Sequence, residues 1–274
     1  MCQSLWEVSD SKIIEHPCPH EGRAFGITWN NNHLFLSRPD RIDVLNHSFK
    51  FSHSLQKGIN GDLHQIAIHQ NTIWSTCPRL NCLASFDLNT NQTRFFLPVE
   101  ERWCGDPSPI TNKMRYETGG AYHYNSLLIK DDNMYVMANN NSFPSFILQM
   151  SLSSMKIVNK LDNIGTEAHN LCFLDKLFFL DSRGRRAIVS EDCVLPVEDD
   201  KHFIRGLAAT ETHFFVGVFP FRTEREERRH GDSYIYQLTH KGEIKNRILL
   251  SGAGDICDIR CVDEYDFAHG IHTL

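Results

Sequence analysis

The stretch His64-Gln65-Ile66-Ala67-Ile68 decides the fold, because the chain repeats its pattern about six times. Each copy is a polar residue followed by a short apolar strand, as in His169-Asn170-Leu171-Cys172-Phe173 and Arg205-Gly206-Leu207-Ala208. Asn125-Ser126-Leu127-Leu128-Ile129 is a further copy, and Phe25-Gly26-Ile27-Thr28-Trp29 and Cys257-Asp258-Ile259-Arg260-Cys261 are weaker ones near the two ends. Repeats roughly 40 to 50 residues apart are typical of the blades of a β-propeller.

The residues between the copies also repeat a pattern of strands. A polar turn and an aromatic-rich second strand follow each copy, as in Asn71-Thr72-Ile73-Trp74, and a third strand follows that, as in Ile42-Asp43-Val44-Leu45. β-branched and aromatic runs between Asn, Asp and Gly turns favour strands over helices. No segment shows a sustained period of 3.6 residues, so the sequence predicts an all-β protein.

We therefore predict one domain over residues 1–274, a six-bladed β-propeller, with five or seven blades as alternatives because the last copy is weak. The blades would start near residues 23, 62, 123, 167, 203 and 255. Residues 4–16 resemble two further strands and would complete the last blade. Pairing the two ends of the chain in one blade would close the ring and remove exposed sheet edges.

Composition excludes several classes of function. A net charge of -6 gives no general attraction to nucleic acid or to an anionic membrane. No apolar run approaches the roughly 20 residues that span a bilayer, and the first residues lack a secretion signal, so we expect a cytoplasmic protein. The nine cysteines include no Cys-x-x-Cys pair, and reduced thiols are the expectation for such a protein.

Two rings of side chains would line the propeller axis. The innermost strand of each blade runs along the central channel, and alternate side chains face it. The first ring holds the starting residue of each copy, namely Phe25, His64, Asn125, His169, Arg205 and Cys257. The second ring holds the residues two positions earlier, namely Arg23, Asp62, His123, Glu167, Phe203 and Asp255. A shift of one residue in any strand would turn its side chains to the other face.

His64, His123 and His169 make the axis a candidate metal site. Three neutral imidazoles suit a divalent transition metal such as Zn, Fe, Mn, Ni or Cu, with a coordination position left for water or substrate. The alternative is that these side chains form a hydrated polar network that only stabilises the ring.

The neighbouring residues supply further candidate roles. Glu167, Asp62 and Asp255 could serve as a ligand, an orienting group or a general base, and with Arg205 they are the predicted catalytic residues. Arginine can hold a carboxylate or phosphate in a bidentate grip, so the substrate is expected to be a small anionic metabolite. The predicted substrate-binding residues are Arg23, Asn125, Arg79, Arg183 and Cys257.

The sequence thus favours a metal-dependent enzyme and leaves hydrolase, lyase, isomerase and oxygen-dependent oxidation open. The alternative is a propeller that binds a ligand or a protein without turnover. Residues 99–118 and 219–232 are long loops that could act as lids. Metal identity and oligomeric state are not readable from these patterns.

Several stretches resemble an uncharacterised bacterial propeller family with Asp-x-His, His-x-Asn-Gly-Leu, Pro-His-Ser-Pro and Arg-Gly-Leu-Ala motifs. They are Gly61 to Ala67, Tyr122 to Leu127, Ala168 to Leu171 and Phe203 to Ala208, within about residues 60–240. Before the second histidine, this chain has Tyr122 where the family has Cys. After the third histidine, it has Asn170-Leu171 where the family has Ser-Pro. The architecture is more remotely similar to the six-bladed gluconolactonase and senescence-marker proteins. Their axial cation is held by Glu, Asn and Asp, so the histidines here differ from that pattern.

Overall fold

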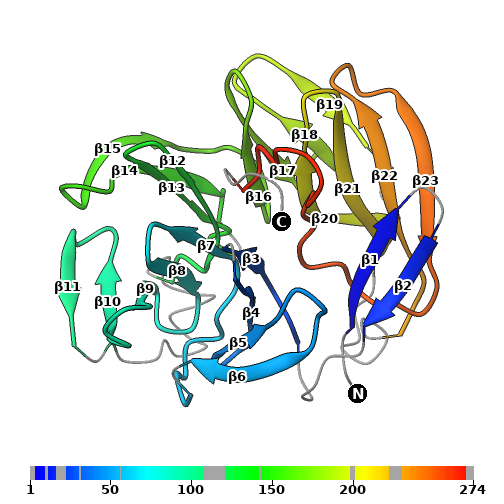
Figure 1. Ribbon diagram of the computed structural model, residues 1–274. Helices are drawn as coiled ribbons and strands as arrows, with labels where there is room; N and C mark the ends of the chain where they lie inside the picture. Colours follow the sequence, from blue (N-terminus) through cyan, green and yellow to red (C-terminus); the bar gives the residue numbers. More distant parts are fainter. Residues whose placement is uncertain are drawn as a thin grey trace.

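A computed structural model shows that the chain is an all-β propeller (Figure 1). The structure describes residues 4–9, 12–16, 23–30, 32–55, 57–105, 107, 121–141, 143–197, 201–221 and 230–269. Every strand pairing in these ranges is antiparallel between strands adjacent in sequence. The aromatic and β-branched runs predicted as second and third strands form the middle of each sheet, as in β4 (Leu34–Ser37) and β5 (Ile42–Leu45).

Five sheets form the blades. Blade 1 is β3 (Ile27–Trp29), β4, β5 and β6 (Phe51–Leu55). Blade 2 is β7 (Ile66–His69), β8 (Thr72–Cys77), β9 (Cys82–Asp87), β10 (Thr93–Leu97) and β11 (Arg102–Cys104). Blade 3 is β12 (Tyr124–Lys130), β13 (Asn133–Ala138), β14 (Phe146–Ser151) and β15 (Lys156–Leu161). Blade 4 is β16 (His169–Phe173), β17 (Leu177–Asp181), β18 (Ala187–Val189) and β19 (Val194–Pro196). Blade 5 is β20 (His202–Ala209), β21 (His213–Pro220), β22 (Ser233–Thr239) and β23 (Ile244–Leu250).

The hydrophobic core lies between the faces of neighbouring blades. Trp74 and Leu83 of blade 2 pack with Leu127 and Val136 of blade 3 in one cluster. Similar clusters join blades 1 and 2, blades 3 and 4, and blades 4 and 5. Apolar contact between blades, rather than a separate centre, therefore holds the ring and leaves its axis to polar side chains.

The prediction of six blades is wrong, and the alternative of five matches the structure. Residues 255–262 form no strand, and β1 (Leu5–Ser9) pairs only with β2 (Lys12–His16) among the described strands. The two ends of the chain therefore do not share a sheet within the described ranges. In Figure 1 the β1–β2 hairpin lies in the ring between blade 5 and blade 1.

The reason for this difference lies in two side chains of the C-terminal segment. Instead of forming a strand, Asp258 and Arg260 bind the backbone N–H and C=O of Ile27 in blade 1 through their side chains. Arg260 also binds the carbonyl oxygen of Leu207 in blade 5. Side-chain hydrogen bonds thus connect the C-terminal segment to blades 1 and 5.

The remaining expectations have mixed outcomes. In the first predicted lid, residues 99–118, Arg102–Cys104 forms β11, and residues 106 and 108–118 lie outside the described residues. In the second predicted lid, residues 219–232, residues 222–229 lie outside the described residues. The seven cysteines in the described ranges are free thiols. No helix in the part of the chain that the structure describes is long and apolar enough to cross a membrane.

Candidate functional site

The residue two positions before the axial residue has left-handed backbone geometry in three consecutive blades. Asp62, His123 and Glu167 have φ values of 53°, 49° and 49°. This geometry turns the carbonyl groups of Asp62 and Glu167 toward the histidines that follow. The Nδ1 atoms of His64 and His169 each lie 2.7 Å from the carbonyl oxygen two residues earlier.

These two contacts fix the tautomer of both imidazoles. A carbonyl oxygen only accepts, so Nδ1 carries a proton in both rings, and in a neutral ring Nε2 then keeps its lone pair. Both side chains are buried, with His64 5% and His169 7% exposed. Burial lowers the pKa of His169 well below its usual value, and the charge of Arg205 lowers it further, so that imidazole is neutral at neutral pH.

Aromatic contacts connect the histidines to their neighbours. Phe25 stacks on His64 with ring centroids 4.3 Å apart, and His123 meets His64 edge-on at 5.4 Å. The guanidinium carbon of Arg205 lies 5.9 Å from the Phe25 ring centroid. The charges of His64 and His123 also act on His169, so Phe25, His64, His169 and Arg205 lie near one another together with His123 of the second ring.

Cys257 repeats the histidine pattern with sulfur. Its Sγ lies 3.8 Å from the carbonyl oxygen of Asp255, two residues earlier, as His64 and His169 do with their carbonyls. Burial raises the pKa of the Cys257 thiol, although the charges of Arg205 and Arg23 lower it. Cys257 is therefore a neutral thiol beside the arginines rather than a nucleophilic thiolate.

Asn125 is the axial residue of blade 3. Its Nδ2 donates to the carbonyl oxygen of Ala168 in blade 4 at 2.8 Å, and the side chain is almost fully buried. Its Oδ1 accepts no hydrogen bond from any described residue. A β-bulge between Tyr124 and Ser126 leaves Asn125 outside the ladder, a feature common beside active sites.

The arginines and carboxylates predicted around the axial site have different environments. Arg183 Nη1 donates to Glu167 Oε1 at 2.6 Å, so that carboxylate is already held by a cation. The backbone N–H groups of Arg79 and Arg183 donate to the carbonyl groups of Gly61 and Thr166, the equivalent positions of blades 2 and 4. The Arg79 side chain is exposed. Asp62 contributes its carbonyl group to the site, as described above.

The structure does not assemble the predicted three-histidine centre. Within the described ranges no three His, Cys, Asp or Glu side chains lie close enough together to hold a metal ion. His123 lies beside His64, whereas the ring of His169 lies edge-on to Phe203 at 5.6 Å. His169 is further held by Ser182, whose Oγ lies 3.1 Å from Nδ1.

Sequence reasoning missed a buried carboxylate on the axis. Asp258 accepts from the Ile27 backbone N–H at 3.1 Å and from side-chain amides of Gln65 and Asn170 at 3.3 and 3.4 Å. It also pairs with Arg260 at 3.0 Å, and burial raises the pKa of Asp258 to about 6. The sequence does mark Asp258, because the second position of the repeat is polar in Gln65, Asn170 and Asp258.

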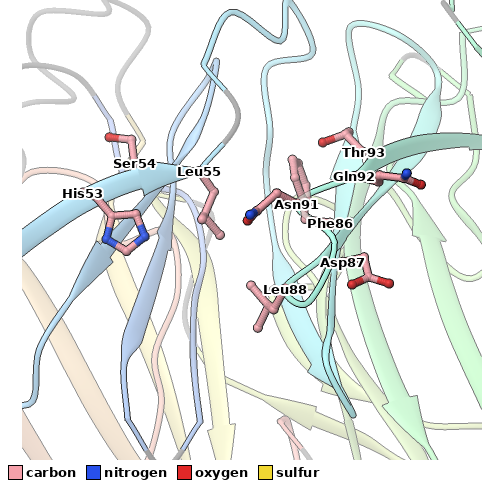
Figure 2. Close-up of a pocket in the computed structure, with 9 residues that line it drawn as sticks. All are labelled: His53, Ser54, Leu55, Phe86, Asp87, Leu88, Asn91, Gln92 and Thr93. Atoms are coloured by element: carbon pink, nitrogen blue, oxygen red, sulfur yellow. The ribbon is translucent and has the colours of Figure 1, made fainter.

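A separate pocket lies away from these residues, between the outer parts of blades 1 and 2. Figure 2 shows Leu55 on β6 facing Phe86, Leu88 and Asn91 across it. Its volume is 380 Å³. None of the predicted site residues lines it, so it does not extend the axial site.

Comparisons with known proteins support the architecture. No protein-family model matches the chain, and no curated protein matches it. A solved structure of a nidogen/laminin complex is 10% identical, with a TM-score of 0.63 and coverage of 93% of this chain and 92% of that chain. Virginiamycin B lyase from Staphylococcus aureus is 11% identical, with a TM-score of 0.53 and coverage of 86% and 89%. The Swd1 β-propeller domain of Myceliophteria thermophila is 10% identical, with a TM-score of 0.51 and coverage of 88% and 90%.

Identities this low establish the propeller fold alone. The resemblance to the uncharacterised bacterial family and to the gluconolactonase type stays a prediction, and function has to be argued from this chain's own residues.

Proposed function

We propose that the chain is an enzyme that acts on a small anionic metabolite at the axial site and depends on a divalent transition metal. One observation carries this proposal: His64 and His169 both donate Nδ1–H to a carbonyl group. Histidines that bind metals through Nε2 almost always have such a hydrogen bond on the other ring nitrogen, because it fixes the tautomer and the ring orientation.

The donor set around these histidines is chemically suited to such a metal. Two imidazoles that share a tetrahedral ion with Zn–N distances of about 2.0–2.1 Å have ring centroids about 5 Å apart. The His64 and His123 centroids are 5.4 Å apart. His169 is neutral, so little proton competition opposes its binding, and Asn125 Oδ1 is a buried oxygen without a donor among the described residues.

Each of these side chains would have a separate task. His64, His123 and His169 would hold the metal once their rings move together, and Asn125 would bind the metal or the substrate. When bound, the metal would polarise a carbonyl oxygen of the substrate or activate water. Arg205 would hold the anionic group of the substrate. Asp62 and Asp255 are the proposed general bases, and Glu167 is held by Arg183.

Two features of the fold support catalysis rather than simple structural packing. The left-handed geometry recurs at Asp62, His123 and Glu167, and such backbone states cluster at functional sites because they cost free energy. The neighbour virginiamycin B lyase is itself named as a lyase, and one structure of it is described as a catalytically inactive form in which a single histidine is replaced by alanine. A propeller can therefore carry an enzyme whose activity depends on a histidine.

Metal content of the protein purified without a histidine tag tests the proposal. We expect about one transition-metal ion per chain by elemental analysis. His64→Ala and His169→Ala should each remove most of it, whereas His53→Ala, an exposed histidine on β6, should leave it unchanged.

A content below about a fifth of one ion per chain after incubation with each candidate metal would overturn the metal-dependent function. Equal metal content in all three variants would overturn it as well. Either result would favour a propeller that binds its ligand without a metal.

A further inference from the structure

Three phenylalanines of blade 5 form a continuous aromatic surface that begins at His169. Phe203 lies edge-on to the His169 ring at 5.6 Å. The Phe219 and Phe221 ring centroids lie 5.6 and 6.4 Å from that of Phe203. Phe219 is buried, whereas Phe221 is 42% exposed. The aromatic surface therefore leads from the axial histidine to solvent.

Arg205 lies next to this surface, and its charge has no counter-ion among the described residues. It stands two residues after Phe203 on β20, and its charge lowers the pKa of His169. Arg205 forms no ion pair with any carboxylate of the described residues and is only partly exposed. A cation withdrawn from water without a counter-ion favours the binding of an anion.

The other arginine at this surface is already neutralised. Arg183 lies 5.6 Å from the Phe221 ring centroid and forms an ion pair with Glu167 at 2.6 Å. Of these two arginines, only Arg205 lacks a carboxylate partner among the described residues. One negative charge matches this arrangement better than a doubly charged phosphate, because a single guanidinium balances a single charge. The planar fork of that guanidinium can bind a carboxylate bidentately.

We propose that the substrate of the axial site is an aromatic carboxylate, with its ring against Phe203 and Phe221 and its carboxylate on Arg205. This inference rests on the proposed function for the location of the substrate, and it adds the chemical class. Aromatic rings prefer edge-on or offset contact with other aromatic rings, and the exposed Phe221 leaves room for such contact. The reacting part of the ligand would lie at His169, where the aromatic surface and the arginine meet.

Binding of benzoate to the full chain tests this inference. Isothermal titration calorimetry should show benzoate binding roughly tenfold or more tightly than acetate, which lacks the ring, and than benzyl alcohol, which lacks the charge. The titrations are carried out on protein treated with a chelator and on protein loaded with metal.

Matched variants assign the binding to these side chains. Arg205→Gln should weaken benzoate binding roughly tenfold or more, because a charge-assisted contact is lost. Phe203→Leu and Phe221→Ser should each weaken it by roughly threefold to tenfold. Arg247→Gln on β23 and Phe215→Leu on β21 change the same residue types elsewhere in blade 5 and should leave binding unchanged.

Phe221→Ser keeps the test valid if Phe203→Leu fails to fold, because Phe221 is exposed. Equal binding of acetate and benzoate, or unchanged binding in Arg205→Gln or in Phe221→Ser, would overturn the inference. If benzoate binds as expected while the protein holds no metal, the metal-dependent function fails and the aromatic carboxylate stands. If the metal binds and benzoate does not, the reverse holds.

Discussion

Oδ2 of Asp258 accepts a hydrogen bond from the backbone N–H of Ile27, 231 positions away in the sequence, at 3.1 Å. Arg260, two residues further on, pairs with Asp258 and donates to the Ile27 carbonyl oxygen at 3.3 Å. Both backbone hydrogen-bonding groups of one residue in blade 1 are thus bound by side chains of the C-terminal segment. This arrangement joins the last part of the ring to the first without a shared sheet.

The pH dependence of stability should report the raised pKa of Asp258. Its pKa is about 6 in the folded chain against an ordinary value of 3.8, because burial disfavours the charged form. The folded state therefore binds the proton more tightly than the unfolded state. The contribution of this carboxyl to stability is fully present below about pH 4 and falls by about 3 kcal/mol as the pH rises through 6.

Urea unfolding of the wild type and of Asp258→Asn between pH 4 and 7 measures this contribution. The free energy of unfolding of the wild type, relative to the variant, should fall as the pH rises. The exposed Asp175→Asn serves as the control, since its difference from the wild type should stay nearly constant. A difference for Asp258→Asn that rises with pH would contradict the assignment.

Removing Arg260 should be strongly destabilising. Arg260→Met leaves the buried carboxylate of Asp258 without its ion pair and takes the Arg260 donor away from the Leu207 and Ile27 carbonyl groups. Breaking one half of a buried ion pair costs about 3–5 kcal/mol. Urea unfolding at pH 7 should show a loss of this size.

The matched control is Arg247→Met on β23, an arginine at the Tyr236 ring. It should cost less than about 1 kcal/mol, since surface cation–π contacts are weak. Similar losses for the two variants would show that Arg260 does not hold the ring together.

Gly165 should tolerate no side chain. A Cβ at this position would lie 2.5 Å from Cγ of Asp181, which accepts a hydrogen bond from the Thr166 backbone N–H. Gly165→Ala therefore displaces the segment that leads to His169. Such overpacking costs about 1–3 kcal/mol.

Gly58→Ala separates overpacking from backbone strain. Gly165 and Gly58 both have a positive φ, 150° and 87°, but a Cβ on Gly58 would meet nothing within 4 Å. Thermal unfolding should show a larger loss for Gly165→Ala than for Gly58→Ala. The NMR signals of the His169 ring should move only in Gly165→Ala, and equal losses with unchanged signals would contradict the role of Asp181.

Arg205 should control the protonation of His169. After burial, the charge of Arg205 is the largest cause that lowers the pKa of His169. Arg205→Gln removes this charge, so the pKa of His169 should rise toward its usual value while staying below it. Nitrogen NMR of the imidazole measures the pKa and should also show Nδ1 protonated in the neutral ring.

Arg247→Gln is again the control and should leave the pKa of His169 unchanged. A pKa of His169 that does not move in Arg205→Gln would place the guanidinium farther from the histidine than the structure does. A neutral ring protonated on Nε2 would contradict the contact with the Glu167 carbonyl group.

The strands that face apolar neighbours on both sides were predictable from the sequence. β5 (Ile42–Leu45) has the predicted bounds, because every residue in it is buried. The outermost strands have weaker signals, as in β15 (Lys156–Leu161), where most side chains are exposed. No alternation of apolar and polar residues marks such an edge strand.

The last blade was misread for a different reason. Cys257 to Cys261 alternates apolar and polar residues as a strand would, yet Asp258 and Arg260 use their side chains to bind neighbouring backbone. A pattern of residue types does not show whether a backbone or a side chain will satisfy a neighbour's hydrogen bonds. The gathering of the axial residues was predictable from the repeat, whereas the orientation of His169 toward Phe203 depends on packing that periodicity does not encode.

The position of Asp258 and Arg260 in the sequence has a consequence for folding order. A ribosome makes all five blades before it makes these two residues, and domains begin to fold while synthesis continues. The nascent blades can therefore stack before the side chains of Asp258 and Arg260 connect blades 1 and 5. Cys257 belongs to that same segment. The hydrogen bonds that connect blades 1 and 5 and the last residue of the axial site are therefore both added late in synthesis.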